Sequence, residues 1–228
     1  MKHVILLSGG IDSATCLGIA ASQEKILNIL ALSVFYGQRH ERELKSSRDL
    51  AAYYGVERHE LDLSIVFKSA QNPLLRADAD IPTGSYAEQQ KKASGMVKTY
   101  IPFRNGLFLS AAASYAMSLY PSDDIFLWIG AHADDAAGDA YPDCSERFIM
   151  SMERALIFGT SGHVSIYAPF VRLNKAKIVD IGLKHKVPYK LTWSCYDGQN
   201  RPCGKCGTCI DRAKAFEANG ITDPALAE

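Results

Sequence analysis

Apolar and polar positions along this chain predict strands that alternate with helices. Five short segments are expected to be strands; most are apolar runs, the third is more polar, and the second is rich in residues that suit burial on both faces. These segments lie at 4–7, 29–35, 56–63, 125–130 and 164–168. Segments with apolar residues at helical spacing lie at 12–22, 41–54, 105–119, 144–158 and 174–186. Such alternation predicts an α/β protein with a parallel sheet covered by helices on both faces.

The positions of the predicted strands also suggest their order in the sheet. Three strands precede a long segment without periodicity, at 64–98, and two follow it. With right-handed crossovers, this arrangement predicts a doubly wound, five-stranded sheet of order 3-2-1-4-5. A ligand site is then expected at the carboxyl end of the first strand, where the order reverses. Segment 64–98 is polar and long for a loop, so we expect a flap or insertion that is partly ordered.

The composition is that of an ordinary globular protein. The chain has 228 residues, of which 47% are hydrophobic, and its 25 basic and 25 acidic residues give a net charge of zero. Proteins that bind nucleic acid through its phosphates are usually basic, so this balance disfavours a nucleic-acid partner. No apolar run reaches membrane-spanning length and no secretory signal is visible, so we expect a cytoplasmic protein without membrane contact. The six cysteines are then expected to stay reduced.

The stretch LLSGGIDSATC, at 6–16, joins the first strand to the first helix through Gly9 and Gly10. Glycines allow positive φ and close approach of a ligand, and the free N–H groups of such a loop suit an anion. Asp12 fits a phosphate site if Mg²⁺ bridges it to the phosphates, or if it caps the helix. The alternative is a tight turn with an Asp cap and no ligand. The loop matches neither the Walker phosphate loop nor the dinucleotide fingerprint.

A second cluster, WSCYDGQNRPCGKCGTC, carries thiols at metal-ligand spacing. Three thiols with two residues between neighbours, and a fourth thiol shortly before them, can surround one tetrahedral Zn²⁺ in a closed, structural site. An iron–sulfur cluster is the main alternative, and four unrelated thiols are another. The predicted metal ligands are Cys195, Cys203, Cys206 and Cys209. Of the other two cysteines, Cys16 is expected to be a small buried residue, and Cys144 is expected near the site.

Two cations are candidates for stabilising a phosphate in the transition state. Arg104 lies at a predicted helix start, and its planar guanidinium suits phosphate oxygens. Lys175 lies in the first turn of another predicted helix, where a cation runs against the helix dipole, so an anion is expected nearby. The alternative for both is a solvated surface side chain.

Further candidates follow the second strand and precede the fourth helix. Gln38 and Arg39 are expected to bind the substrate, Arg39 through a carboxylate, and His40 is a candidate for proton transfer. Asp135 and Asp143 are candidate acceptors for hydrogen bonds from a ligand. Solvated loop side chains are the alternative for these residues.

The glycine loop resembles that of a known family. Ser8, Gly9, Gly10, Asp12 and Ser13 match the S-G-G-x-D-S loop of the ATP pyrophosphatases, at the expected place after the first strand. In that family the loop holds the ATP triphosphate while a substrate oxygen attacks the α-phosphate. Six stretches in order narrow the resemblance to the 7-cyano-7-deazaguanine synthase family of queuosine biosynthesis. They are SGGIDSATC, FYGQRHERE, IPFRNGLFLSAAASYA, YPDC, APFVRLNKAKIV and TWSCYDG with PCGKCGTC.

This resemblance implies a fold, a reaction and a set of cofactors. The fold would be adenine-nucleotide α-hydrolase-like over 1–190, with a small zinc-binding segment over 191–228. The reaction would use ATP, Mg²⁺ and ammonia to convert 7-carboxy-7-deazaguanine to 7-cyano-7-deazaguanine, through an adenylated acid, an amide and an adenylated amide. Zn²⁺ and a homodimer are also implied. The residues expected to bind ATP are Leu7, Ser8, Gly9, Gly10, Ile11, Asp12, Ser13, Ala14, Thr15, Cys16 and Leu17.

The stretch GAHADDAAGDAYPDC departs from the family pattern, because other members carry a shorter one there. The roles of His132, Asp134 and Asp135 are therefore open. Two other functions compete with the synthase. One is a related ATP pyrophosphatase that modifies tRNA by thiolation or lysidine formation, and the other is a zinc-ribbon module whose loop senses ATP. Both would be expected to bind nucleic acid, which the neutral charge disfavours.

Overall fold

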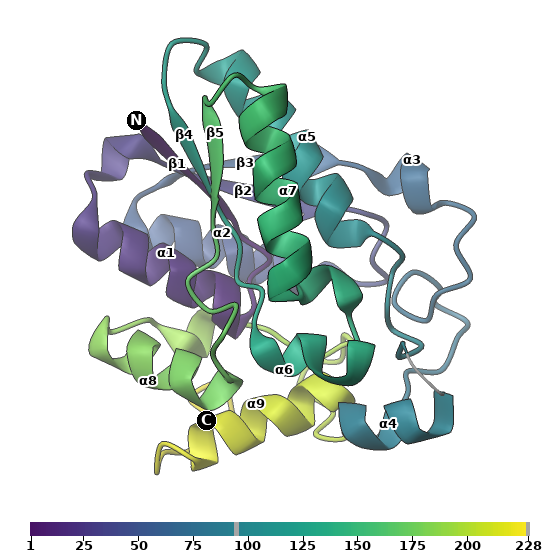
Figure 1. Cartoon of the computed structure of the whole chain (residues 1–228). Helices are drawn as coiled ribbons and strands as arrows, with labels where there is room; N and C mark the ends of the chain where they lie inside the picture. Colours follow the sequence, from purple (N-terminus) through teal and green to yellow (C-terminus); the bar gives the residue numbers. More distant parts are fainter. Residues whose placement is uncertain (94–95, 227–228) are drawn as a thin grey trace.

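The computed structural model describes residues 1–93 and 96–226 and has one parallel sheet with helices on both faces (Figure 1). The strand order is β3-β2-β1-β4-β5, and all neighbouring strands are parallel. The strands are β1 Lys2–Leu6, β2 Ile29–Phe35, β3 Glu57–Asp62, β4 Ile125–Trp128 and β5 Val164–Tyr167. The predicted fold class and strand order are confirmed.

The five predicted helices are present, with bounds shifted by a few residues. They are α1 Ile11–Gln23, α2 Arg42–Tyr54, α5 Arg104–Leu119, α7 Glu146–Gly159 and α8 Lys175–Lys184. Sequence periodicity did not indicate four further helices, α3 Ser64–Phe67, α4 Tyr86–Ala93, α6 Ala133–Ala136 and α9 Gly207–Glu217. Single turns of 3₁₀ helix are η1 Ile26–Asn28, η2 Ala137–Asp139, η3 Pro142–Cys144 and η4 Tyr189–Leu191.

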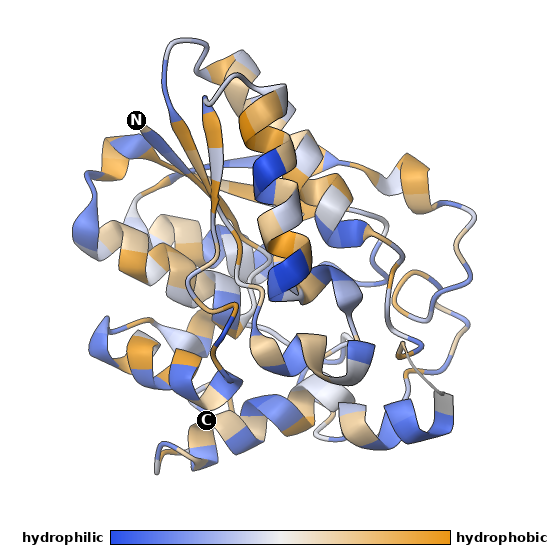
Figure 2. Cartoon of the chain, viewed as in Figure 1, coloured by the Kyte–Doolittle hydropathy of each residue, from blue (hydrophilic) through white to orange (hydrophobic). Residues whose placement is uncertain are grey.

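Alternate side chains of the central strand serve two separate cores, because successive residues of a strand point to opposite faces. Ile5 packs in one core with Leu17 of α1 and Ile178 of α8. Val4 packs in the other with Leu109 of α5 and Ile149 of α7. Figure 2 shows apolar residues along the central strands, and polar and apolar residues mixed along the surrounding helices.

The predicted insertion leaves the sheet after β3 and returns before α5. The side-chain amide of Asn72 donates to the carbonyl oxygens of Lys98 and Tyr100, at 3.2 and 2.8 Å, and so closes its base. The segment contains α3 and α4, joined by turns. Residues 94 and 95 lie outside the described residues, and the expectation of a partly ordered flap or insertion stays a prediction.

The C-terminal segment packs against both the insertion and the glycine loop. The N–H of Gly84 donates to the carbonyl oxygen of Lys205 at 3.0 Å. The N–H of Trp193 donates to the carbonyl oxygen of Gly9 at 2.9 Å. Two stretches far apart in sequence are thus held beside the end of β1. The proposed boundary between 1–190 and 191–228 stays a prediction.

The C-terminal segment should depend on one buried ion pair. Arg212 of α9 makes two hydrogen bonds to Asp223, at 2.6 and 2.8 Å, and both residues are buried. Asp223→Ala leaves the guanidinium uncompensated and should lower the free energy of unfolding by about 3–5 kcal/mol. Asp49→Ala removes an exposed pair with Lys45 and should cost about 0.5 kcal/mol or less. Denaturant unfolding compares the two variants, and equal losses would show that the buried pair does not hold the segment.

Candidate active site

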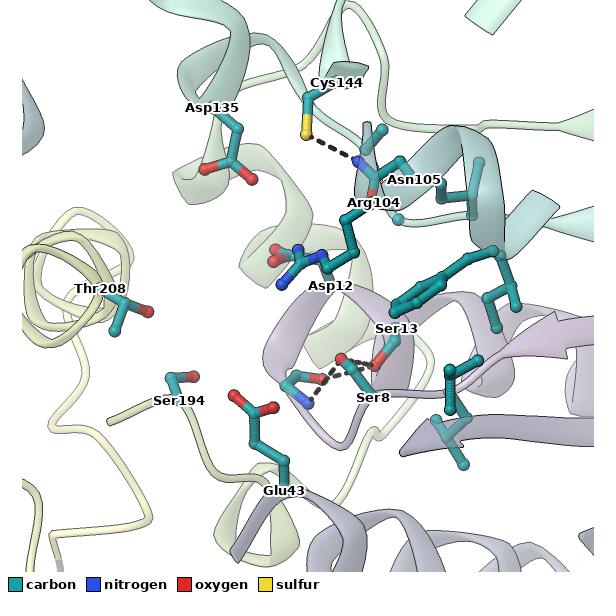
Figure 3. Close-up of a pocket in the computed structure, with 18 of the residues that line it drawn as sticks. Ser8, Asp12, Ser13, Glu43, Arg104, Asn105, Asp135, Cys144, Ser194 and Thr208 are labelled. Atoms are coloured by element: carbon teal, nitrogen blue, oxygen red, sulfur yellow. Dashed lines mark hydrogen bonds between the residues drawn. The ribbon is translucent and has the colours of Figure 1, made fainter. Parts of the chain in front are cut away.

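A cavity opens at the carboxyl ends of β1, β2 and β4, where the strand order reverses (Figure 3). This is the position that the topology predicts. Its walls come from the glycine loop, the first turns of α2, α5 and α8, the segment after β4 and the C-terminal segment. Its polar lining includes Ser8, Asp12, Ser13, Gln38, Glu43, Arg104, Asn105, Asp135, Lys175, Ser194 and Thr208.

The glycine loop leaves the N-terminus of α1 without a side-chain cap. Gly9 has φ +94°, and a β carbon there would lie 2.3 Å from the carbonyl oxygen of Glu43, so the position requires glycine. Gly10 is the N-cap residue of α1, and no side chain accepts from the first-turn N–H groups. The alternative in which Asp12 caps the helix is therefore wrong. An uncapped helix N-terminus at a cavity is a site for an anion.

The predicted ATP-binding stretch divides into members that line the cavity and members that face the protein interior. Leu7, Ser8 and Ser13 line the cavity, and the two serine hydroxyls lie 3.1 Å apart. Burial raises the pKa of the Cys16 thiol well above its usual value, as expected for a small core residue. The members that face the protein interior instead are Ile11, Ala14, Thr15, Cys16 and Leu17.

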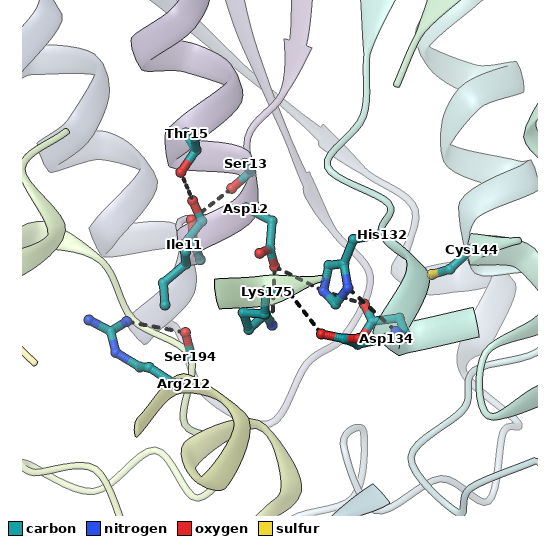
Figure 4. A network of polar contacts seen from close by, with 12 residues as sticks. Ile11, Asp12, Ser13, Thr15, His132, Asp134, Cys144, Lys175, Ser194 and Arg212 are labelled. Carbon is teal, nitrogen blue, oxygen red and sulfur yellow. Dashed lines mark hydrogen bonds and ion pairs between the residues drawn. The ribbon is translucent and has the colours of Figure 1, made fainter. Parts of the chain in front are cut away.

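Asp12 and Lys175 meet in the cavity beside a buried histidine (Figure 4). Oδ2 of Asp12 lies 3.3 Å from Nζ of Lys175 and 3.7 Å from Nε2 of His132. The same Nε2 lies 3.3 Å from Oδ2 of Asp135. Among the described residues, Oδ1 of Asp12 and Nε2 of His132 are buried without a hydrogen-bond partner. One carboxylate oxygen of Asp12 is therefore available to a ligand.

Lys175 is a buried cation, and carboxylates keep it charged. Burial lowers its pKa, but Asp12, Asp135 and Asp211 raise it by more, so the pKa lies above its usual value. The backbone N–H of Lys175 donates to Oδ2 of Asp134 at 2.8 Å, which satisfies one group of the α8 N-terminus. The expectation of an anion near this first-turn lysine is met by Asp12.

Arg104 begins α5 and projects into the same cavity. Phe103 before it adopts φ +55°, a conformation that non-glycine residues rarely take, and this kink turns the chain into the helix. The guanidinium lies over the rings of Tyr36 and Phe108, at 5.3 and 5.8 Å from their centroids. Burial lowers the pKa of Arg104, but surrounding groups including Asp143 raise it by more, so the side chain stays cationic.

The three candidates after β2 have structural roles in this arrangement. Gln38 lines the cavity, but its amide bonds to the backbone of its own turn. Arg39 donates to carbonyl oxygens of the insertion, including that of Ala79 at 2.8 Å. Nε2 of His40 lies 3.2 Å from the carbonyl oxygen of Tyr196, and burial lowers the histidine pKa. Neither Arg39 nor His40 is among the residues that line the cavity.

The two aspartates expected to accept hydrogen bonds from a ligand differ in position. Asp135 lines the cavity beside His132. Oδ2 of Asp143 instead accepts the backbone N–H of Asn105 at 2.9 Å, and the residue is not part of the lining. The Asn105 amide in turn donates to Sγ of Cys144, which does line the cavity. Asp143 therefore holds the start of α5.

Several lining residues were not predicted from the sequence. They are Tyr36, Glu43, Ser194, Tyr196 and Thr208. Glu43 had a usable signal, because the helix predicted after the second strand begins at the same sheet edge as the glycine loop. The others lie in stretches that carried the family resemblance, Tyr36 in FYGQRHERE and the remaining three in TWSCYDG and PCGKCGTC. Those stretches indicated a family and a metal site and gave no sign that these side chains face the cavity.

The four predicted metal-ligand cysteines do converge. The Sγ atoms of Cys195, Cys203, Cys206 and Cys209 all lie within 4.8 Å of one another. The N–H groups of Cys203 and Cys206 point to the sulfurs of Cys195 and Cys203, at 3.2 and 3.4 Å. Such donors stabilise thiolates around a metal. The donor set therefore fits one tetrahedrally coordinated metal ion.

Comparison with known proteins decides the family. A family model described as Queuosine biosynthesis protein QueC matches residues 2–220. The chain belongs to the QueC family. Proteins named 7-cyano-7-deazaguanine synthase are similar to this QueC chain. The one from Thermoplasma acidophilum is 44% identical, covering 98% of this chain and 90% of its own. Those from Archaeoglobus fulgidus and Marinobacter nauticus are 38% and 37% identical, covering 100% and 99% of this chain and 91% and 96% of their own.

Membership of the QueC family confirms the resemblance that the six stretches indicated. It also confirms the prediction of an ATP-dependent enzyme of queuosine biosynthesis that forms carbon–nitrogen bonds on a small molecule. Over residues 1–93 and 96–226, no helix is long and apolar enough to cross a membrane. Magnesium, zinc, ammonia and the homodimer stay predictions.

The tight approach at Gly9 gives a test of the loop. Gly9→Ala should destabilise the protein by about 1–3 kcal/mol from backbone strain alone, with a further cost from the clash with α2. Gly10→Ala is the matched control, because its β carbon would meet its nearest neighbour at 3.6 Å with ordinary φ. Thermal unfolding compares them. A Gly9→Ala protein as stable as Gly10→Ala would refute the structural role of Gly9.

Proposed function

We propose that this QueC protein converts 7-carboxy-7-deazaguanine and ammonia to 7-cyano-7-deazaguanine in the cytoplasm, with ATP cleaved to AMP and pyrophosphate. One observation carries the proposal. The uncapped N-terminus of α1, the half-buried cation of Arg104 and the buried cation of Lys175 face a single cavity beside the matched glycine loop. A carboxylate oxygen is a poor leaving group, so it must be activated before ammonia can replace it. A cavity that holds a triphosphate beside cations suits that activation.

The loop residues Ser8, Gly9, Gly10 and Ser13 would hold the triphosphate through N–H and hydroxyl donors. Asp12 would hold Mg²⁺, because Mg²⁺ prefers oxygen ligands and Oδ1 of Asp12 has no hydrogen-bond partner among the described residues. The bound ion would neutralise phosphate charge. This accounts for a carboxylate at a site that otherwise attracts anions.

Arg104 and Lys175 have different tasks in this proposal. The planar guanidinium of Arg104 is fixed by two aromatic rings, so it would bind phosphate oxygens in a set orientation. Lys175 already contacts Asp12, so it would stabilise the negative charge that builds up beside the metal. Both groups are ordered before a ligand binds, which lowers the cost of reorganisation during the reaction.

The cysteine cluster would hold Zn²⁺ in a structural site. Four thiolates close the coordination sphere, and the reaction needs no electron carrier, so zinc suits the site better than an iron–sulfur cluster. Two of the ligands are chain neighbours of cavity residues, Cys195 of Ser194 and Cys209 of Thr208. The ion would therefore also fix one wall of the cavity. A homodimer, which the family resemblance implied, belongs to the same proposal.

Turnover tests the proposed reaction. Protein supplied with ATP, Mg²⁺, ammonium and 7-carboxy-7-deazaguanine should release pyrophosphate and AMP with a base of nitrile mass. Lys175→Met and Arg104→Gln should each lower kcat roughly 10²–10³-fold, as removal of one preorganised charge does. Lys177→Met, at an exposed lysine paired with Asp180, should leave kcat unchanged. Folded, metal-loaded wild-type protein that makes no nitrile would sink the assignment of this substrate.

Metal analysis tests the cluster. Purified protein should contain one zinc ion per chain, without iron or the visible absorption of an iron–sulfur cluster. Cys206→Ser should lose the metal and melt at a lower temperature, because metal binding contributes to folding. Cys144→Ser removes a buried thiol outside the cluster and should keep the full metal content. Stoichiometric iron in the wild type would contradict the choice of zinc.

A further inference from the structure

Glu43 is a carboxylate of the cavity that no described residue binds. It lies in the first turn of α2, and Figure 3 shows its carboxylate pointing into the cavity. Over residues 1–93 and 96–226, its side chain forms no hydrogen bond or ion pair. Burial raises the pKa of Glu43 to about 7, opposed in part by the cation of Arg104. Glu43 is half-buried, and a carboxylate partly removed from water without donors is costly, so this position suits a ligand that brings donors of its own.

The other carboxylates near the cavity are already engaged. Asp12 contacts Lys175, Asp135 contacts His132, and Asp143 accepts a backbone N–H. Glu43 therefore differs from them in having both oxygens available. Neither Asp135 nor Asp143, the two candidate acceptors, offers two unengaged oxygens to the cavity.

The surroundings of Glu43 are rigid. Its carbonyl oxygen packs so closely on Gly9 that a β carbon there would lie 2.3 Å away, so this turn of α2 rests on the glycine loop. Across the cavity, the hydroxyl of Ser194 is fixed by the guanidinium of Arg212 at 3.2 Å. Tyr36 and Tyr196 line the same cavity, so aromatic side chains are available beside a bound ring.

We infer that Glu43 selects the base by accepting hydrogen bonds from its 2-amino group and the adjacent ring N–H. These two donors lie side by side on a 7-deazaguanine ring, and the two oxygens of one carboxylate can accept both. The inference rests on the proposed function, because it names the residue that recognises the proposed substrate. It makes Glu43 a determinant of specificity and gives it no part in the chemical step.

Two bases and two variants test this inference. The substrates are 7-carboxy-7-deazaguanine and its analogue without the 2-amino group, with steady-state pyrophosphate release as the readout. Wild-type protein should favour the natural base by roughly 10–100-fold in kcat/KM, and Glu43→Gln should lose most of that preference through a higher KM for the natural base. The KM for ATP should stay unchanged. Glu41→Gln, an exposed residue just before the same helix, is the matched control and should behave as wild type.

Each result separates this inference from the proposed function. Wild-type protein that never forms the nitrile defeats the proposed function, and the inference falls with it. Wild-type protein that makes the nitrile but accepts both bases equally overturns the inference alone, whatever the stability of the variant. A Glu43→Gln protein that changes only the KM for ATP, or only kcat at saturating base, also overturns it. Those outcomes would place Glu43 on the nucleotide or in proton transfer.

Discussion

The site depends on the central position of β1. Its neighbours β2 and β4 lie on opposite sides, and the connections that lead to them run over opposite faces of the sheet. The chains leaving these strands therefore diverge and cannot close over the end of β1. The glycine loop turns into α1 in that opening, and the C-terminal segment reaches it through the bond from Trp193 to Gly9. The cavity thus follows from the topology.

The cavity is lined by three carboxylates, Asp12, Glu43 and Asp135, and two cations, and these charges are only partly paired. Burial lowers the pKa of Lys175 and of Arg104, but neighbouring carboxylates and tyrosines raise it by more and keep both side chains cationic. Asp12 keeps one oxygen without a hydrogen-bond partner among the described residues, and Glu43 has neither a hydrogen bond nor an ion pair there. Folding has therefore placed polar groups in a desolvated space where a ligand must complete their bonding. A triphosphate, a metal ion and a base with N–H donors together supply the missing partners.

The sequence predicted the sheet and its order because buried parallel strands are short apolar runs, and four of them stand out here. The edge strand β3, ERHELD, is mostly polar and was placed by its position in the alternation of strands and helices. The sequence also located the glycine loop, both cations and the cysteine cluster, whose spacing is local. It missed α9, whose first residues belong to the cysteine motif and hide the helical pattern. It missed the engagement of Arg39, because the carbonyl oxygens that this side chain binds lie in an insertion without periodicity. Side-chain partners from distant segments leave no local pattern.

Isotope transfer tests the central claim most directly, namely that a substrate oxygen attacks the α-phosphate of ATP held by the glycine loop. The measurement uses 7-carboxy-7-deazaguanine labelled with ¹⁸O in its carboxylate and follows the label by mass spectrometry. Activation at the α-phosphate predicts that both labelled oxygens end in AMP, one for each ATP consumed, and that pyrophosphate stays unlabelled. Label in pyrophosphate would contradict the account, and so would label in inorganic phosphate with ADP as the other product.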